Sequence, residues 1–396
     1  MSEVFFEKYM GALLRFKLRF VSELIGQRDF ALVIAFCTLF EAFYKDEDNN
    51  MDVPGNDLPE GHSSYIEKWF QYCLVWSIGA TADEGGRIKI DNCFRDMDST
   101  FPPQRTVYDY FVDVERKEFR LWDDKVPQNR RPPPNAEFFQ IYVPTLDTVR
   151  NMAIVNKLVS VKQAVCLVGN TGCGKTVLAE KILETLPSSH GSLVVNFSSA
   201  TTSNSAQAII EGSMEKRSKD KYGPPGGKQL VCFVDDFNMP RKDEFGSQPP
   251  LEILRQWIDY GGWYDRLKCQ WRFILDMQLV VAMGPPGGGR SVISERLQSR
   301  LSMINFTAAA DEQVRQIFES ILTPKLAEYG EDIKPLTKNF IAATVLVYNK
   351  MLDDFLPTPA KCHYLFNMRD IAKVVQGMCY ADSNFIDSKE GIIRLW

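Results

Sequence analysis

Short apolar runs recur through the middle of the chain, and helical or loop segments separate them. Five of these runs have the length of buried strands: 164–168, 193–197, 230–234, 279–283 and 303–306. Their connections are longer than hairpin turns, so the pattern predicts a parallel sheet covered by helices. The predicted fold class is therefore α/β, a five-stranded parallel sheet with helices, preceded by a helical segment and followed by a small helical domain.

Outside these runs, apolar residues recur at spacings of three and four, which is typical of helices. Helices are expected at 1–44, at 65–78, from Asp83 onward, and at 311–323, 335–352 and 368–379. The apolar run from Phe30 to Phe40 is shorter than the ~20 residues that cross a bilayer, so we expect a buried helix and no membrane association. After Phe306 no further strand is predicted.

Polar and proline-rich stretches suggest where the domains meet. Residues 45–64 are rich in helix breakers and read as a loop, whereas 101–135 read as irregular. Pro132 to Pro134 mark the entry to the sheet domain. Four segments are predicted in chain order: a helical segment, a helical lead-in with a linker, a large α/β nucleotide-binding domain and a small helical domain, over 1–60, 61–135, 136–308 and 309–396.

Composition narrows the range of functions. The chain has 396 residues, with 45% hydrophobic and 24% charged residues, which are ordinary globular values. Its net charge of −5 offers no broad basic surface, so we expect no nucleic-acid partner. The nine cysteines form no CxxC pair, which favours reduced thiols in a cytosolic protein over disulfides or a zinc site. The first residues do not resemble a signal peptide.

The segment from Gly169 to Thr176 fits the pattern GxxxxGK[ST], and it lies between an apolar run and a helical pattern. Glycines let backbone N–H groups turn toward phosphate oxygens, and the following helix adds its positive N-terminal end. We expect Lys175 to reach the β- and γ-phosphates and Thr176 to bind Mg²⁺. A glycine-rich turn without a ligand is disfavoured by the complete motif. The predicted cradle consists of Gly169, Asn170, Thr171, Gly172, Cys173, Gly174, Lys175 and Thr176.

Two acids follow the apolar run 230–234, where parallel sheets bind ligands at the carboxyl ends of their strands. Asp235 is predicted to hold Mg²⁺, directly or through water. Asp236 stands where a carboxylate that activates water would lie. A solvated acidic turn is the alternative, which the nearby phosphate cradle makes less attractive.

The next apolar run leads into a glycine-rich segment, Gly284 to Arg290. Glycines there are equally consistent with a close backbone approach and with a flexible loop. Two arginines follow, Arg296 and Arg300. An arginine at a domain edge can stabilise transition-state charge on a phosphate bound by a neighbour, although most surface arginines have no such role.

At these residues the chain resembles the dynein heavy chains of the axonemal type. The resemblance extends over nearly the whole chain and is carried by FVDDFNMP at 233–240, GSQPPLEILRQW at 246–257, AMGPPGGGR at 282–290, LPTPAKCHY at 356–364 and FNMRD at 366–370. These segments resemble the third of the six AAA+ modules in the motor ring more than the second.

The resemblance implies further roles. Val143, Pro144 and Thr145 would flank the adenine, and Arg369 would be the sensor-II arginine that reaches the phosphates from the small domain. Arg296 or Arg300 would be the arginine finger that acts on the preceding module. Residues 198–229 and 246–278 would carry two hairpin inserts, and 1–60 would end the preceding module.

The resemblance also implies ligands, partners and location. ATP or ADP and Mg²⁺ are the expected cofactors, and a Mg²⁺-dependent ATPase activity that is weak in isolation is the expected reaction. Neighbouring AAA+ modules of a dynein ring and other dynein subunits are the expected partners, in the cytoplasm, cytoskeleton and axoneme of a cilium or flagellum. Microtubules would be reached only through parts absent from this chain, so we expect a fragment or short product of a heavy chain.

Two departures from the AAA+ pattern predict slow hydrolysis. AAA+ ATPases usually have Glu where Asp236 stands, and a polar residue where this strand ends in Met283-Gly284-Pro285. The leading interpretation is an ATP-binding module that hydrolyses slowly or serves regulation. A nucleotide-locked regulatory module and a ring component that holds no nucleotide are the alternatives. A kinase or GTPase is disfavoured, because no guanine-specificity signal is visible.

Overall fold

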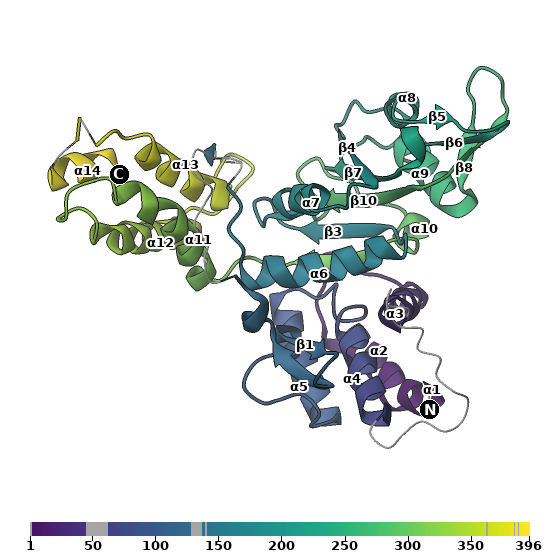
Figure 1. Ribbon diagram of the computed structural model, residues 1–396, viewed down its shortest axis with the longest axis horizontal. Coiled ribbons are helices and arrows are strands. Elements are labelled where there is room, and N and C mark those ends of the chain that lie inside the picture. Colours follow the sequence, from purple (N-terminus) through teal and green to yellow (C-terminus); the bar gives the residue numbers. More distant parts are fainter. Residues whose placement is uncertain are drawn as a thin grey trace. The chain divides into compact units, whose positions relative to one another are not determined.

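The computed structural model describes most of the chain (Figure 1). The described residues are 2–44, 62–127, 137–138, 141–361, 363–383, 385–386 and 388–396. Residues 45–61 of the loop predicted at 45–64 lie outside them, as do the prolines 132–134, whereas the prediction is wrong for residues 62–64, which are helical. Two compact units are present, and each is described by itself below: a first unit of 1–124, 150–170 and 174–307, and a second unit of 125–149, 171–173 and 308–396.

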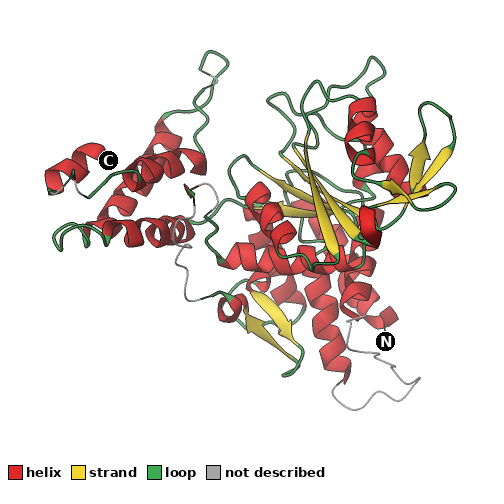
Figure 2. Ribbon diagram, turned by 45° about the horizontal axis from the view of Figure 1, so that its top comes forward, coloured by secondary structure: helices red, strands yellow, loops and turns green. Residues whose placement is uncertain are grey.

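A parallel sheet forms the centre of the first unit (Figure 2). Its strands are β3 (Val165–Gly169), β4 (His190–Asn196), β7 (Gln229–Asp235), β10 (Met277–Met283) and β11 (Ser302–Phe306). All five predicted strands are confirmed, and their order across the sheet is β11-β3-β10-β7-β4. Strand β10 therefore lies between β3, which leads into the glycine loop, and β7, which ends in the acids.

Both faces of this sheet are apolar, as expected for parallel strands covered on two sides. Alternate residues such as Cys166, Val168 and Val234 face one hydrophobic core, which also contains Trp257 and Trp263. Their neighbours in the strands are equally buried. The runs of β3, β7, β10 and β11 are continuous rather than alternating because both of their faces are buried, whereas the edge strand β4 exposes residues such as Val194.

The chain forms helices before the first strand of the parallel sheet and between its successive strands. They are α6 (Leu146–Ser160), α7 (Lys175–Glu184), α8 (Ser203–Glu211), α9 (Pro249–Tyr260) and α10 (Glu295–Gln298). Local signals explain the ends of α9: two prolines occupy its first turn, where their missing N–H groups are not needed, and Gly261 ends it at φ +69°.

A second, four-stranded sheet lies on the same unit. It consists of β5 (Glu215–Lys216), β6 (Lys221–Gly223), β8 (Gly262–Tyr264) and β9 (Trp271–Ile274), in the order β5-β6-β9-β8. Two antiparallel pairs are joined by a parallel pairing of β6 with β9. The expected hairpins in 198–229 and 246–278 are confirmed.

The N-terminal part of the first unit is helical. Its elements are α1 (Ser2–Phe5), a π-helix (Phe6–Met10), α2 (Gly11–Phe20), α3 (Asp29–Tyr44), α4 (His62–Val75) and α5 (Glu84–Met97). Phe36 and Phe70 pack with ring centroids 4.7 Å apart. Arg87 of α5 donates to the Asn305 carbonyl at 2.6 Å, and Asn305 Nδ2 donates to the Ala82 carbonyl at 2.9 Å, so this part is attached to β11.

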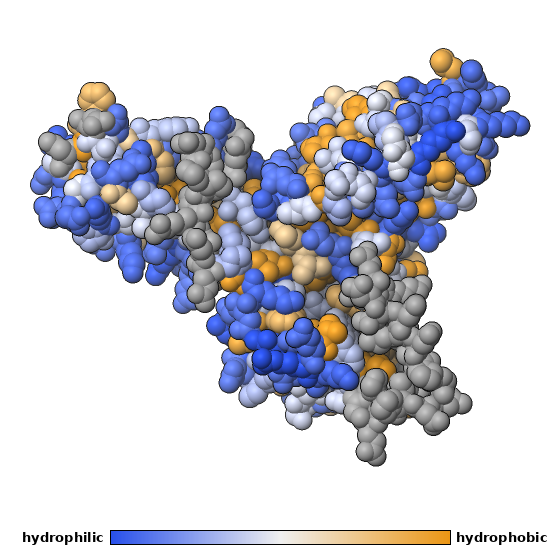
Figure 3. Space-filling view, viewed as in Figure 1, coloured by the Kyte–Doolittle hydropathy of each residue, from blue (hydrophilic) through white to orange (hydrophobic). Residues whose placement is uncertain are grey.

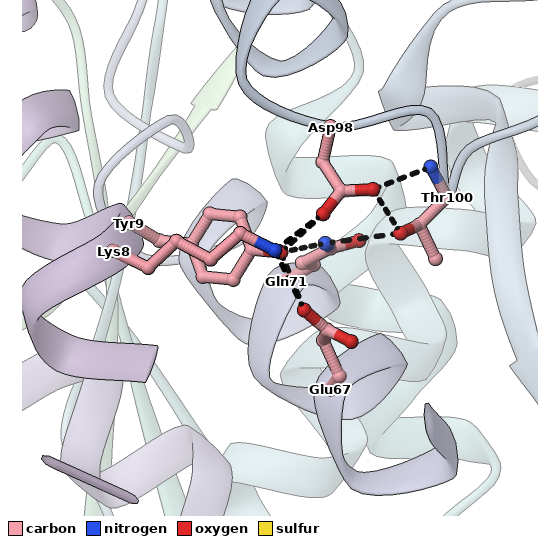
Figure 4. A network of polar contacts seen from close by, with 6 residues as sticks. All are labelled: Lys8, Tyr9, Glu67, Gln71, Asp98 and Thr100. Carbon is pink, nitrogen blue, oxygen red and sulfur yellow. Dashed lines mark hydrogen bonds and ion pairs between the residues drawn. The ribbon is translucent and has the colours of Figure 1, made fainter. Parts of the chain in front are cut away.

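Polar groups also join these helices (Figure 4). Lys8 Nζ lies 2.6 Å from Asp98 Oδ2 and 3.1 Å from Glu67 Oε1, and Tyr9 Oη lies 2.5 Å from each of the same two oxygens. Gln71 Nε2 donates to Tyr9 Oη at 3.0 Å. The π-helix is thereby fixed to α4 and to the end of α5.

The apolar run from Phe30 to Phe40 is helical but only partly buried. Leu32 and Phe36 are 1% exposed, whereas Phe30 is 57% and Ile34 is 45% exposed. The prediction of a buried helix is therefore wrong for one side of α3, because an all-apolar sequence does not say which side packs. No helix among the described residues has the length and hydrophobicity that a membrane span needs. The face in Figure 3 is mainly hydrophilic, with apolar residues interspersed.

The prediction of irregular structure over 101–135 is wrong in its middle. Strands β1 (Tyr110–Asp113) and β2 (Glu118–Leu121) form an antiparallel hairpin, flanked by short 3₁₀ turns at Val107–Asp109 and Trp122–Lys125. Lys117 has φ +56° at the turn. Strands of four residues are too short for a periodicity signal, and their pairing is set by packing against α4.

The second unit is helical from residue 308 onward. Its helices are α11 (Asp311–Leu326), α12 (Leu336–Asp354), α13 (Met368–Cys379) and α14 (Lys389–Leu395). The three helices predicted here are confirmed. Phe318, Leu322, Ile341 and Val375 form the centre of a separate hydrophobic core.

The described cysteines of both units are free thiols, and burial raises the pKa of Cys232, in β7 of the first unit, to about 12.

Candidate nucleotide-binding site

The predicted cradle begins where β3 ends and α7 begins. Gly172 has φ +83° and Gly174 has φ +85°, a region that glycine enters without steric cost. A Cβ atom at Gly174 would meet no atom within 4 Å, so its backbone approaches open space. The expected strand, glycine loop and helix are therefore present in the structure.

Lys175 is the first residue of α7. Its Nζ donates to the carbonyls of Gly169 and Asn170, each at 2.8 Å. These bonds hold the ammonium at the mouth of the loop, where a phosphate would need a positive charge.

The next residue connects the loop to the acidic strand. Thr176 Oγ1 donates to Asp235 Oδ2 at 2.7 Å, and the Asp236 N–H donates to Asp235 Oδ1 at 2.8 Å. The two predicted metal-binding residues thus lie side by side, although β10 separates their strands in the sheet. A hydroxyl and a carboxylate are hard oxygen ligands, the donor set that Mg²⁺ prefers, so these residues fit the ion.

Asp236 has an unusual backbone and a charged partner. Its φ is +50°, in the left-handed region that Asp tolerates better than most residues. Arg290 Nη2 lies 3.3 Å from Asp236 Oδ1, and the Asp236 side chain is 49% exposed. A single long pair at this exposure stabilises the fold by less than about 1 kcal/mol. The ion pair with Arg290 therefore holds the Asp236 side chain only weakly.

Arg290 comes from the glycine-rich segment after β10. Gly287 and Arg290 exchange backbone hydrogen bonds of 3.0 Å, and Gly287, Gly288 and Gly289 all have positive φ. The turn returns the Arg290 side chain to the end of β10, where a Cβ at Gly284 would come within 2.9 Å of its Nε. A close approach is therefore present at Gly284, whereas Gly287, Gly288 and Gly289 border open space and supply the positive φ angles of the turn.

Arg290 is a residue of this site that the sequence alone did not indicate. The strand end was expected to provide only the residues Met283-Gly284-Pro285, with no side chain that could replace the usual polar group. The structure shows that a side chain six residues later occupies the position beside Gly284. The sequence feature that could have indicated Arg290 is the glycine at the strand end, Gly284, followed by a run of glycines and then the arginine.

The two finger candidates differ in their surroundings. Arg300 Nε pairs with Asp259 Oδ1 at 2.6 Å, and Arg255 Nη1 pairs with the same carboxylate at 2.7 Å. Arg296 is exposed on α10. Arg300 is thus attached to α9.

The remaining predicted site residues belong to the second unit. Val143 is buried in its hydrophobic core, and the Thr145 N–H donates to Thr148 Oγ1 at 2.8 Å at the start of α6. Arg369 is exposed in the first turn of α13, and its N–H donates to Asn367 Oδ1 at 2.9 Å. Their roles toward a nucleotide, like those of Pro144 and Thr171 to Cys173, stay predictions.

Comparison with known proteins agrees with this geometry. Residues 130–309 match the family model of the P-loop containing dynein motor region, and residues 2–124 match that of the dynein heavy chain AAA lid domain. Dynein axonemal heavy chain 2 of Mus musculus is 47% identical over 99% of this chain. The chain belongs to the dynein heavy chain family. Residues 340–396 match a general AAA+ lid domain.

Other dynein heavy chains also match nearly the whole of this chain. Dynein axonemal heavy chain 2 of Homo sapiens is 46% identical over 99% of this chain and 9% of its own length. The dynein-1-beta heavy chain of the flagellar inner arm I1 complex of Chlamydomonas reinhardtii is 42% identical over 98% of this chain and 9% of its own. The mouse relative is likewise covered over 9% of its length, so the chain spans about a tenth of these dyneins.

Proposed function

We propose that this chain is an ATP-binding AAA+ module of an axonemal dynein heavy chain, the third of the motor ring, and that it hydrolyses ATP slowly. The hydrogen bond from Thr176 to Asp235, 2.7 Å long, is the observation that carries this proposal. It joins the phosphate cradle to the acidic strand in the arrangement that P-loop ATPases use for Mg²⁺.

Each residue has a role in this proposal. The backbone of the cradle and Lys175 bind the phosphates, and Thr176 and Asp235 hold Mg²⁺, which neutralises phosphate charge when bound. Asp236 orients the attacking water. Its side chain, one methylene shorter than that of Glu, supports slow turnover. Val143 to Thr145 contact the adenine, and Arg369 acts from the small domain.

The neighbouring modules of the ring complete the site. We propose that Arg296, rather than Arg300, acts on the preceding module, since both side chains are exposed but Arg300 is engaged with Asp259. The large domain would then extend over 136–308 and the small domain over 309–396. The lid match over 2–124 supports a preceding module whose lid includes both predicted N-terminal segments.

The whole motor gives the cellular context. Within an axonemal dynein, the module would set the conformation of the ring during ciliary or flagellar movement, together with other dynein subunits. Contact with microtubules would belong to other parts of the heavy chain. A nucleotide-locked module without turnover remains the second candidate, favoured by the weak support of Asp236.

Two measurements on the purified chain test the proposal. Nucleotide released on denaturation is quantified by chromatography, and steady-state phosphate release is followed with Mg²⁺ present. We expect bound nucleotide and little turnover, since loss of a neighbour's arginine costs ~10³-fold or more in rate. A chain that neither retains nor binds nucleotide would contradict the proposal, as would rapid turnover that is independent of protein concentration.

A further inference from the structure

The contact between Asp236 and Arg290 suggests a function beyond slow hydrolysis. The guanidinium meets one carboxylate oxygen at 3.3 Å, through Nη2 alone. An arginine can pair with a carboxylate through two parallel hydrogen bonds, which are shorter and stronger than the single contact seen here. The observed pair therefore leaves much of the binding capacity of Arg290 unused.

Unpaired groups are found beside this contact. Arg290 Nε is buried and has no hydrogen-bond partner among the described residues, and the same holds for Asn238 Oδ1. Asn238 Nδ2 donates to the Gly284 carbonyl at 2.9 Å, so both residues are held at the end of β10. Buried donors without partners are uncommon, but the Nε atoms of Arg217 and Arg272 are in the same condition, so the unpaired Nε of Arg290 points to a ligand only together with the place of this residue at the strand end.

The position of this strand end indicates what the ligand would be. Strand β10 pairs with β3 on one side and with β7 on the other. In a parallel sheet the carboxyl ends of neighbouring strands meet at one edge, so Arg290 lies between the start of the cradle and the acids. Planar guanidinium groups bind phosphate oxygens well, and a terminal phosphate carries more negative charge than a carboxylate.

We propose that Arg290 is the residue by which this module distinguishes ATP from ADP. In the ATP state Arg290 binds the terminal phosphate and releases Asp236, which is then available to the attacking water. In the ADP state Arg290 returns to Asp236. This inference rests on the proposed function, because it requires that the cradle binds a nucleotide.

The test compares affinities rather than rates. Fluorescent ADP and a fluorescent non-hydrolysable ATP analogue are titrated into the full chain and its variants with Mg²⁺ present. Arg290→Met should weaken binding of the ATP analogue about tenfold or more and change ADP binding by less than about twofold, because ADP lacks the phosphate that Arg290 contacts. Arg241→Met, which removes an exposed charge from the loop after β7, is the matched control and should change neither affinity.

A second variant displaces Arg290 without changing its charge. The added Cβ of Gly284→Ala would lie 2.9 Å from Arg290 Nε and 3.0 Å from its Cδ, so the arginine must move. We expect the same selective loss of ATP-analogue affinity. Thermal unfolding of each variant verifies that the chain is folded.

Asp236 and the terminal phosphate compete for Arg290, so removal of Asp236 should change the affinity for the ATP analogue in the opposite direction. Asp236→Ala frees Arg290 and should tighten binding of the ATP analogue several-fold. The gain should be smaller in the Arg290→Met background, where only the repulsion between carboxylate and phosphate has been removed. The difference between the two gains measures the coupling directly.

The possible results separate this inference from the proposed function. Equal losses for ADP and the ATP analogue in Arg290→Met would assign the residue a structural role and overturn the inference alone. Unchanged affinities in both Arg290→Met and Gly284→Ala would do the same. A wild-type chain that binds neither nucleotide would overturn the proposed function and the inference together.

Discussion

Thr176 Oγ1 donates to Asp235 Oδ2 at 2.7 Å, although 59 positions separate the two residues in the chain. One residue comes from the helix that follows the glycine loop, and the other ends a strand two places away in the sheet. Their contact places a hydroxyl and a carboxylate at one point beside the cradle.

Lys175→Ala should abolish tight nucleotide binding, because it removes the ammonium that lies at the cradle mouth and contacts the Gly169 and Asn170 carbonyls. Hydrogen bonds to charged groups are worth about 1.5–3 kcal/mol each, so the loss should be at least tenfold. Fluorescent-nucleotide titration measures it. Lys181→Ala on the same helix, whose Nζ pairs with Glu184 at 2.9 Å, should retain wild-type affinity. Unchanged ATP affinity in Lys175→Ala would place the site elsewhere.

Asp235→Ala and Thr176→Val should remove the part of nucleotide affinity that depends on Mg²⁺. Both substitutions take away an oxygen from the predicted ion position while leaving Lys175 in place. Titrations with Mg²⁺ and with excess chelator should differ for the wild-type chain and converge for both variants. If Mg²⁺ still tightened binding in Asp235→Ala as it does in the wild type, the metal assignment would be wrong.

Asp236→Glu should raise single-site turnover. Asp is one methylene shorter than Glu, and a misplacement of ~1 Å in a catalytic group can cost on the order of 10²-fold. The assay needs the neighbouring modules restored, with their own P-loop lysines removed so that only this site turns over. An equal or lower rate would mean that the left-handed backbone at Asp236, φ +50°, already places the shorter acid correctly.

Asp98→Asn should destabilise the first unit. Burial raises the pKa of Asp98, but hydrogen bonds from Lys8, Thr100 and Tyr9 outweigh it and hold that pKa well below its usual range. A depressed carboxyl pKa stabilises the fold above the unfolded value of about 3.9, and this contribution is lost as the pH falls below about 4. The Asp98 side chain is 19% exposed and Lys8 is 43% exposed, so we expect a loss of about 1–2 kcal/mol at pH 7.

Urea unfolding at pH 7 and at pH 3 measures this effect. The gap between Asp98→Asn and the wild type should narrow at the lower pH, because the Asp98 carboxyl of the unfolded wild-type chain, with an ordinary pKa of about 3.9, is largely protonated there and this favours unfolding. Asp96→Asn, at an exposed position in the last turn of α5 and two residues before Asp98, should match the wild type at both pH values. A gap that stays constant with pH would show that the charge of Asp98 does not carry the stabilisation.

Local patterns in the sequence determined much of this protein. The glycine loop, the five strands and the small-domain helices are each encoded within a window of about 5–20 residues, where periodicity and motif spacing are informative. The sequence predicts Asp235 as a Mg²⁺ ligand because a carboxylate that ends a buried parallel strand lies at the carboxyl edge of the sheet, where ligands bind. The matches to the family models of the dynein lid and motor region agree with the family that these motifs indicated, and so does the similarity to axonemal heavy chain 2.

Only the tertiary structure decided which side chains meet. The pairing of Asp236 with Arg290 depends on a glycine turn whose direction no spacing rule predicts, and Arg300 differs from Arg296 because Asp259 lies within reach. The hairpin at β1 and β2 is too short for periodicity, and α3 is apolar on all sides, so packing alone decided that Phe30 stays exposed and Phe36 does not. Side-chain pairs and buried faces depend on residues distant in the chain, and these contacts form only when the sheet and its helices are assembled.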